Sequence, residues 1–501
     1  MKSLFFRCFV FLLLLLGVCM LIGYQNILFY RPQSIHQWAQ CDRASVAFNY
    51  YMNGFHFFTP QVHNISNGTG ITGLEFPIIN YLAAIGYAIF GFHEYIYRGI
   101  VFVCLLTGLI NAFRLANMLL SNSIVAALPV YLLFASPVLA YYGITFMADP
   151  ASLGFALSGW YYFFRWLENK KSSMLIATII FCSLASMIKI SSLINPMAMA
   201  AFVFLNVDEK SVTIIKNRIV NALPFLIILL PVLAWYFYAS WLNKTYESKV
   251  FMLEMRPVGS WEEFSSIWKE IQQTWFWRFY PKIYFIALFI ATVTLVFLPQ
   301  KINRPLLTIT LLLYAGSLSF FLLMFTQFRV HDYYIIPLMP AFFFHWLLII
   351  KQFSLMENVQ LKKLSAALLL ALVCFVTAEA KDHLRTAHTK TSWKYSSPVY
   401  DRYFFLEPEL RKLNIRPDDP VVSICDLSFN VSLYLMNQQG FTVGPRTPQK
   451  DIIKELKNPI YKYAILNNFN PSRFDSVMDS LNLGKKILEW NDLTIYQLPV
   501  K

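Results

Sequence analysis

Apolar residues gather in long runs over roughly the first 380 positions of this chain, with few charged residues inside them. A helix needs roughly 17 to 25 apolar residues to cross about 30 Å of hydrocarbon. Runs close to that length predict eleven membrane-spanning helices, near 4–24, 98–118, 124–142, 150–167, 174–190, 193–207, 219–242, 283–299, 305–326, 334–350 and 364–380. The run at 193–207 is short and contains Pro196, so it also fits a half-helix, which would reverse every later loop.

Positive charges indicate the direction of these crossings, because short cytoplasmic loops collect Lys and Arg. With the N-terminus inside, the inner loops hold residues such as Lys170, Lys171 and Arg304, whereas the short outer loop 143–149 holds none. Lys189 and Arg329 lie at outer ends and therefore need a different explanation. Eleven crossings also place the C-terminal residues on the outer face.

Two longer loops are predicted on the outer side of the transmembrane part, residues 1–380. The first, 25–97, contains two aromatic and apolar stretches typical of interfacial helices, Val46–Phe58 and Ile78–Phe92. An Asn- and Gly-rich turn at 64–73 separates them. The second outer loop comprises residues 243–282.

Beyond residue 380 the composition becomes mixed and polar. Short runs of alternating apolar residues at 421–425, 463–466 and 493–498 predict strands, with helix-like stretches between them. Residues 381–501 are therefore expected to form a small extracytoplasmic α/β domain.

The composition excludes an ordinary soluble globular protein, since 57% of the residues are hydrophobic and only 14% are charged. The class that fits is a polytopic α-helical membrane protein. Inner loops account for much of the net charge of +14, and no Lys- and Arg-rich stripe with interleaved aromatics appears, so a nucleic-acid partner is not expected. Most cysteines lie in apolar runs, which argues against a disulfide framework.

Chemically versatile side chains recur at the predicted outer face. Charge beside hydrocarbon is costly, so such residues usually mark a site or a polar path. The set comprises Trp38, Asp42, Arg43, Glu75, Asp149, Lys189, Arg329, His331 and Tyr333. Together they suit a lipid-linked phosphate substrate, because cations hold a phosphate and a carboxylate can deprotonate an attacking hydroxyl.

Most of these residues also have a purely structural interpretation. Asp149 precedes Pro150 and fits a helix N-cap, and Glu75 fits a solvated loop carboxylate. The basic side chains could extend to lipid headgroups. Their shared position on one membrane face favours a joint site.

A family resemblance follows from several of these motifs together. The stretch from His36 to Tyr51, with Glu75-Phe76-Pro77, Tyr97-Arg98-Gly99, Asp149-Pro150 and His331-Asp332-Tyr333-Tyr334, resembles bacterial relatives of the dolichyl-phosphate-mannose protein mannosyltransferases. These form glycosyltransferase family 39, which includes the lipid A aminoarabinose transferases. The resemblance implies a GT-C membrane fold and inverting transfer of a sugar from a polyprenyl phosphate to an acceptor on the outer face.

The resemblance also implies roles for individual residues. Asp42 takes the position of the catalytic acidic residue in the first loop, whose carboxylate acts as the general base. Asp149 takes the position of the acidic residue that opens the fourth helix. Phosphate-side candidates are Arg43, Lys189, Arg329 and His331, with Arg98 a weaker one.

One difference separates this chain from the eukaryotic members. They have a paired Asp-Glu where Asp42 is followed here by Arg43, so the acceptor cannot be carried over. Similar enzymes work without a metal, and none is expected here, although Asp42, Glu75, Asp149 and His331 are residue types that bind hard cations. No other cofactor is expected.

The predicted function is thus a membrane glycosyltransferase of the bacterial inner membrane. Its partners are a polyprenyl-phosphate-linked sugar donor, membrane lipids and a lipid, glycan or protein acceptor. The alternatives are a flippase or transporter of lipid-linked saccharides, which would favour midplane charges and internal repeats, and a ligase of such saccharides, which would centre on a large late loop.

Overall fold

The computed structural model describes residues 2–120, 122–205, 212–248, 251, 255–297, 302–389, 398–444, 446–467 and 484–499. The chain divides into two compact units. The helical unit comprises Met1–Phe29, Arg98–Phe237 and Leu253–Arg385. The mixed unit comprises Tyr30–Tyr97, Tyr238–Met252 and Thr386–Lys501. The mixed unit therefore combines C-terminal residues with most of the predicted first outer loop and the beginning of the second.

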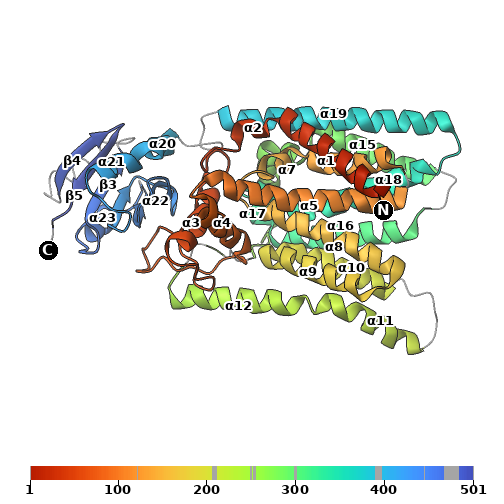
Figure 1. The fold of residues 1–501 in the computed structure, drawn as a ribbon, viewed down its shortest axis with the longest axis horizontal. Helices are drawn as coiled ribbons and strands as arrows, with labels where there is room; N and C mark the ends of the chain where they lie inside the picture. The colour runs from red at the N-terminus through yellow and green to blue at the C-terminus, as the bar shows by residue number, and fades with distance from the viewer. Residues whose placement is uncertain are drawn as a thin grey trace. The chain divides into compact units, whose positions relative to one another are not determined.

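The described part of every apolar run predicted to span the membrane is mainly helical. The helices are α1 (Lys2–Ile22), α5 (Glu94–Leu120), α6 (Ser123–Phe134) with α7 (Pro137–Tyr142), α8 (Asp149–Asn169), α9 (Ser172–Ile188), α10 (Ile194–Leu205), α11 (Val212–Leu226) with α12 (Leu229–Thr245), α15 (Lys282–Phe297), α16 (Arg304–Leu323), α18 (Met339–Ser354) and α19 (Val359–Thr389). The long helices α5, α16 and α19 lie roughly along the horizontal of Figure 1, whereas α1 is inclined to them. The ends of two predicted runs, 206–207 and 298–299, lie outside the described residues.

The number of crossings is a separate question from the number of helices. Within the described ranges, six helices are long and apolar enough to cross a membrane, or seven if the bent pair Trp261–Phe279 and Lys282–Phe297 forms one span. The residues Ile190–Leu205 form one of several shorter apolar helices, as a half-helix would. The count of eleven crossings remains a prediction.

Shorter elements connect these helices. They are α2 (Tyr24–Ile27), the 3₁₀ helix η1 (Ile190–Leu193), α13 (Trp261–Ile271), the π-helical turn η2 (Gln272–Phe276), α14 (Trp277–Phe279), α17 (Phe325–Phe328) and the 3₁₀ helix η3 (Asp332–Leu338). The break between α6 and α7 follows from the sequence. The Ser136 hydroxyl accepts a hydrogen bond from the Leu139 amide and donates one to the Phe279 carbonyl, and Pro137 suits the first helical turn.

Glycine permits a close approach of α5 and α8. A Cβ atom on Gly108 would overlap the backbone of Gly154, and one on Gly154 would overlap the carbonyl of Cys104. Small residues allow helices in membranes to pack backbone against backbone. This contact fixes α8, whose first residue is Asp149, against α5.

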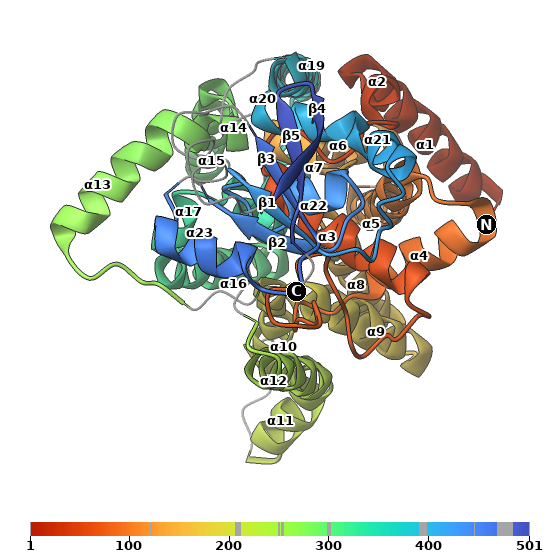
Figure 2. The same ribbon diagram turned by 90° about the vertical axis from the view of Figure 1, so that its left-hand side faces the viewer.

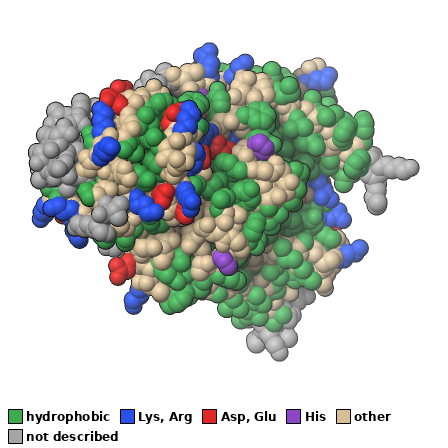
Figure 3. Space-filling view, turned by 60° about the vertical axis from the view of Figure 1, so that its left-hand side comes forward, with side chains coloured by type: hydrophobic (Ala, Val, Ile, Leu, Met, Phe, Trp, Pro, Cys, Tyr) green, Lys and Arg blue, Asp and Glu red, His purple; other side chains and the backbone are tan. Residues whose placement is uncertain are grey.

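The outward side chains of the helical unit match a lipid environment. Phe5 on α1, Phe289 on α15 and Leu368 on α19 are more than 60% exposed. Figure 3 shows hydrophobic side chains over much of one face of the molecule. Exposed apolar patches of this extent mark an interaction surface, and with the apolar helices they identify a multi-pass membrane protein.

The mixed unit contains two helices from the predicted first outer loop and a small α/β fold from the C-terminal residues. The two helices are α3 (Gln37–Met52) and α4 (Ile78–Phe90). The C-terminal elements are α20 (Pro398–Asp401), η4 (Arg402–Phe405), α21 (Leu406–Lys412), β1 (Val421–Ile424), α22 (Val431–Leu435), β2 (Gly440–Val443), α23 (Gln449–Leu456), β3 (Tyr463–Asn467), β4 (Lys485–Trp490) and β5 (Leu493–Gln497).

The strands form a five-stranded sheet in the order β2-β1-β3-β5-β4. β1 is parallel to β2 and β3, with Val421 opposite Gly440 and Tyr463, whereas β5 is antiparallel to β3 and β4. The predicted strands at 421–425, 463–466 and 493–498 correspond to β1, β3 and β5. Sequence reasoning missed β2 and β4.

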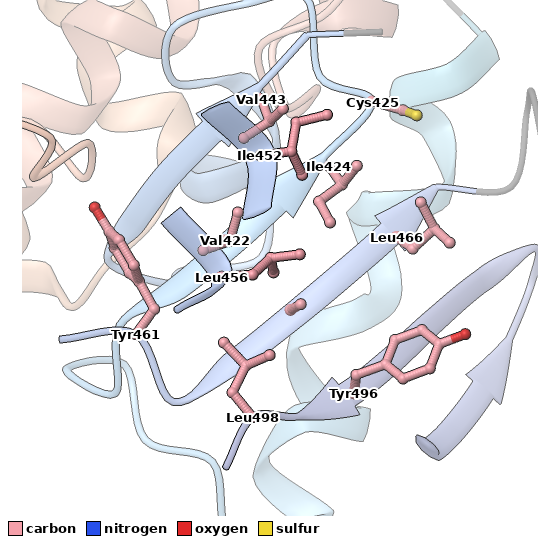
Figure 4. Close-up of a cluster of buried hydrophobic side chains, with 11 residues drawn as sticks. Val422, Ile424, Cys425, Val443, Ile452, Leu456, Tyr461, Leu466, Tyr496 and Leu498 are labelled. Carbon is pink, nitrogen blue, oxygen red and sulfur yellow. The ribbon is translucent and has the colours of Figure 1, made fainter. Parts of the chain in front are cut away.

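The faces of the sheet follow the alternation of side chains along β1. Val422 and Ile424 lie in an apolar core with Ile452 and Leu456 of α23 (Figure 4). The Ser423 hydroxyl, on the other face, accepts a hydrogen bond of 2.8 Å from Ser432 of α22. Figure 2 shows α22 and α23 on opposite sides of β1.

The predicted Asn- and Gly-rich turn extends this sheet. The Ile65 amide donates to the Gly440 carbonyl at 2.8 Å, and the Gly440 amide donates to the His63 carbonyl at 3.1 Å. These bonds form a parallel bridge between Asn64 and Gly440 at the edge of β2. The first loop and the C-terminal fold are therefore joined within the mixed unit.

Candidate active site

Asp42 lies on α3 and faces a cavity of about 500 Å³. Its side chain is almost completely buried, with 3% exposed, and among the described residues Oδ1 has no hydrogen-bond partner. A buried acceptor without a partner is unusual, because buried polar groups are nearly always satisfied. Asp42 is therefore available to bind or deprotonate a group that enters the cavity.

The surroundings of Asp42 raise its pKa to about 7. The main cause is loss of solvation on burial, and the negative charges of Asp426 and Glu75 add to it. The positive charge of Arg43 acts in the opposite direction. A carboxylate with a pKa near neutrality is a stronger base than an ordinary aspartate and is still partly ionised at pH 7.

Arg43 and Glu75 form a largely buried ion pair, with 8% and 13% of their side chains exposed. Nη2 of Arg43 lies 2.5 Å from Oε1 of Glu75, and Nη1 donates to the carbonyl of Ala39. Asn80 of α4 donates to the Arg43 carbonyl at 2.8 Å. These contacts link α3 to the beginning of α4.

Three other chain segments border the cavity. Asn64 and Asn67 come from the predicted turn, Ser248 from the residues after α12, and Phe429 from the loop after β1. Trp38, one helical turn before Asp42 on α3, also lines the cavity and is 42% exposed. The sequence indicated Trp38 but gave no sign of the other contributors, since they are distant along the chain.

Asp149 and Lys189 form an ion pair in the helical unit. Oδ2 of Asp149 lies 3.3 Å from Nζ of Lys189, and Asp149 is 1% exposed. Ala148 occupies the N-cap position, so Asp149 is the first residue of α8 and does not cap it through its side chain. An acidic residue in the first turn is favoured by the helix dipole. Lys189, which ends α9, thus contacts an internal carboxylate.

The motif from His331 to Tyr334 opens the η3 segment. The ring of Tyr333 lies 5.9 Å from Nζ of Lys189, and η3 packs against α8 and η1. His331 stacks on Tyr334 and its Nδ1 lies 3.0 Å from the Gln327 carbonyl. Tyr333 and Lys189 are therefore neighbours, as a shared site requires.

Asp332 and Tyr142 are two members of this group that sequence reasoning did not select. Asp332 is fully buried and accepts a hydrogen bond of 2.7 Å from the Tyr142 hydroxyl. Tyr142 also packs edge to face on Tyr333. The signal for Asp332 was present, because it is an acidic residue between the predicted candidates His331 and Tyr333.

The two remaining arginines have contrasting surroundings. Arg98 is fully buried, donates to the Ile144 carbonyl at 2.7 Å and lies over the ring of Phe146, so it supports the segment before Asp149. The Arg329 side chain is 51% exposed, with Glu270 at 3.9 Å, while Trp275 donates to its carbonyl. Arg329 is thus a cation at the surface of the helical unit.

The predicted site residues therefore form two groups. Trp38, Asp42, Arg43 and Glu75 belong to the mixed unit, and Arg98, Asp149, Lys189, Arg329, His331 and Tyr333 to the helical unit. Across the described ranges, no cluster of three or more His, Cys, Asp or Glu residues is arranged to hold a metal ion.

Comparison with known proteins supports the predicted resemblance. Residues 75–235 match the family model described as dolichyl-phosphate-mannose-protein mannosyltransferase. No curated protein matches the chain.

Solved structures show a similar fold over nearly the whole length. The crystal structure of ArnT from Cupriavidus metallidurans in the apo state has 12% sequence identity and a TM-score of 0.61, covering 98% of this chain and 97% of that one. ArnT bound to undecaprenyl phosphate gives 13% identity and a TM-score of 0.62, with 97% of both chains covered. Arabinofuranosyltransferase AftD from Mycobacteria gives 11% identity and a TM-score of 0.56, covering all of this chain and 40% of AftD. The predicted GT-C fold with a small C-terminal sheet domain is confirmed.

Proposed function

We propose that this protein is an integral-membrane glycosyltransferase that moves a sugar from a polyprenyl phosphate to an acceptor hydroxyl on the outer face of the bacterial inner membrane. The observation that carries the proposal is Asp42, a buried carboxylate with a raised pKa that faces a cavity. The match to a mannosyltransferase family model and the ArnT-like fold support the same class of reaction.

In the proposed reaction Asp42 acts as the general base. Its carboxylate takes the proton of the acceptor hydroxyl while the oxygen attacks the anomeric carbon of the sugar. The bond from that carbon to the phosphate oxygen breaks, and polyprenyl phosphate leaves with the electron pair. A single displacement of this kind inverts the anomeric centre. The proton on Asp42 is then returned to water.

The residues of the helical unit are proposed to hold the donor phosphate. Lys189 and Arg329 supply positive charge and His331 a hydrogen-bonding ring nitrogen, which together would stabilise a leaving phosphate. Asp149 would orient Lys189 through their ion pair, and Tyr333 would pack beside it. We give Arg43 and Arg98 supporting roles, because Glu75 and the Ile144 carbonyl already engage them. The proposed reaction includes no metal ion.

The test is to incubate purified protein with a panel of radiolabelled undecaprenyl-phosphate sugars and a membrane extract, and to follow loss of sugar from the lipid. Asp42→Asn should abolish transfer and leave donor binding largely intact, since only the basicity of the side chain is lost. Asp451→Asn, an exposed position on α23, serves as the matched control.

Near-normal transfer by Asp42→Asn would contradict the assignment of Asp42 as the general base. A lack of turnover with every donor, together with movement of the labelled lipid across proteoliposomes, would identify the flippase alternative instead.

A further inference from the structure

The cavity beside Asp42 is lined by both polar and apolar residues, and the charge of its lining is one-sided. Asp42 and Glu247 are the ionisable residues among those that line it, and both are acidic. Within the described part of the chain, neither forms an ion pair. Arg43, the cation adjacent in sequence to Asp42, is bound to Glu75 instead. No described cation therefore faces this cavity.

The negative charge of the cavity lining affects phosphate and hydroxyl groups differently. Like charges repel each other more strongly in a cavity that partly excludes water than they do in bulk water. A phosphate in the cavity would meet one or two carboxylates, and no cation among the lining residues that the structure describes. A hydroxyl group can instead donate its proton to the same carboxylates, so the cavity favours hydroxyl-bearing groups over phosphates.

Hydrogen bonds hold the part of the cavity lining that includes Thr72 and Ser248. Asn243 accepts from the Gly73 amide at 2.7 Å and donates to the Gly73 carbonyl at 3.0 Å. The hydroxyls of Thr72 and Ser248 lie 2.7 Å apart. These bonds place Glu247 beside the turn that carries Asn67, so the acidic lining is built into the fold.

The C-terminal fold fixes a second wall. Nδ2 of Asn64 donates to the Phe429 carbonyl at 2.6 Å, and the Asn64 amide donates to the Asn430 side chain at 3.1 Å. Phe429 and Trp38 are the two aromatic residues that line the cavity. An aromatic ring combined with polar groups suits the apolar face of a sugar ring and its hydroxyls.

We infer that this cavity is the acceptor subsite and that the acceptor is a saccharide whose reacting end carries hydroxyl groups and no phosphate. Glu247 binds hydroxyls of this sugar and Trp38 packs against its ring, while Asp42 takes the proton of the reacting hydroxyl. The role of Asp42 as base rests on the proposed function, whereas the ligand class rests on the lining of the cavity.

The ligand class can be tested by saturation-transfer NMR on the full-length protein in detergent. The probes are the methyl glycosides of glucose, galactose and mannose, each compared with the corresponding sugar 6-phosphate. At least one methyl glycoside should bind about tenfold more tightly than its phosphate, as expected from about 1.4 kcal/mol of charge repulsion. Equal or tighter binding of the phosphates would overturn the inference.

Two variants connect this binding to the cavity. Trp38→Ala should weaken glycoside binding, whereas Trp261→Ala, which removes an indole 74% exposed on α13, should not. Glu247→Lys should reduce or reverse the preference against the phosphates. Unchanged binding and selectivity in both Trp38→Ala and Glu247→Lys would mean that the sugars bind elsewhere.

A third measurement separates acceptor from donor. Asp42→Asn is saturated with an undecaprenyl-phosphate sugar identified by the transfer assay, and the glycoside should remain bound. Displacement would assign the cavity to the donor sugar and overturn the inference. Asp42-dependent transfer without selective glycoside binding would contradict only this inference, whereas selective binding with no transfer from any donor would contradict the proposed function.

Discussion

At the scale of single residues, Asp42 shows how a functional group can oppose stability. Its folded-state pKa of about 7 lies above the ordinary value of 3.8. The folded protein therefore retains this proton at pH values where the unfolded chain has lost it. Stability from this group is fully present below pH 3.8 and is lost as the pH rises to about 7, because the unfolded chain releases a proton that the folded protein keeps. A less buried aspartate would avoid this cost and would be a weaker base.

The pKa of Asp42 predicts the pH dependence of transfer. The rate should fall as the pH decreases through about 7, because protonated Asp42 cannot accept the acceptor proton. Asp426→Asn should move this acidic limb to lower pH, since a neighbouring negative charge that raises the pKa is removed. The measurement is the pH profile of sugar release, with Asp451→Asn as control. A limb that stays at the same pH in Asp426→Asn would contradict the electrostatic account.

Substitutions in the ion pair of Arg43 and Glu75 should lower the stability of the protein and leave the transfer reaction possible. Glu75→Ala should destabilise the protein by about 3 to 5 kcal/mol, as is usual when one partner of a buried pair is removed. The double variant Arg43→Met with Glu75→Leu should recover much of this loss and still transfer sugar at pH 8.5. Thermal unfolding and the transfer assay measure both effects. A double variant that is stable but inactive would show that Arg43 or Glu75 is needed for catalysis.

Residue-scale candidates came from the sequence by a simple rule. Charged residues near apolar runs are few, so Asp42, Asp149 and Lys189 could be selected without a structure. The same rule could not show that Arg43 and Lys189 have different roles. Their difference depends on which carboxylate each one meets, and those partners are 32 and 40 positions away.

At the scale of elements, the pattern of apolar residues in the sequence predicted the positions of the helices better than those of the strands. β1 and β3 are buried and read as short apolar runs, whereas β4 is partly exposed and includes Lys485, Lys486 and Glu489. β2 is only four residues long and begins with Gly440, which pairs closely with Val421. Edge strands carry weak signals because partner strands, not their own side chains, determine their pairing.

Gly73 offers an element-scale prediction. A Cβ atom at this position would overlap the carbonyl of Ala239 in α12. Gly73→Ala should therefore separate the first loop from the end of α12, lower the melting temperature by several degrees and weaken glycoside binding in the cavity. Gly99→Ala on α5, where a Cβ would meet no atom within 4 Å, should be neutral or stabilising. Equal behaviour of the two variants in thermal unfolding would contradict this packing argument.

At the scale of the whole molecule, the structural units do not follow the order of the chain. Arg31, near the beginning, lies 3.2 Å from Glu94 and donates to the carbonyls of Phe404 and Leu435. The Tyr434 hydroxyl also donates to Glu94. The mixed unit is therefore held together by contacts between residues up to 404 positions apart.

Arg31→Ala tests this cohesion. It removes three polar contacts from a partly buried position, so the mixed unit should lose about 2 to 4 kcal/mol of stability. Amide hydrogen exchange should become faster both at 60–75 and in β2, because the two segments are paired. Arg385→Ala, which breaks an exposed pair with Asp382, should change little. Faster exchange in β2 alone would show that the two segments open independently.

The sequence by itself determined the membrane class, the positions of the main helices, three of the strands and the family resemblance. These properties follow from local composition, because hydrocarbon thickness and side-chain periodicity act on neighbouring residues. Only the tertiary structure decided that Asp42 faces a cavity bordered by Asn64, Glu247 and Phe429, and that Lys189 pairs with Asp149. Burial, pKa and cavity charge depend on residues brought together from distant parts of the chain, and no local pattern specifies those contacts.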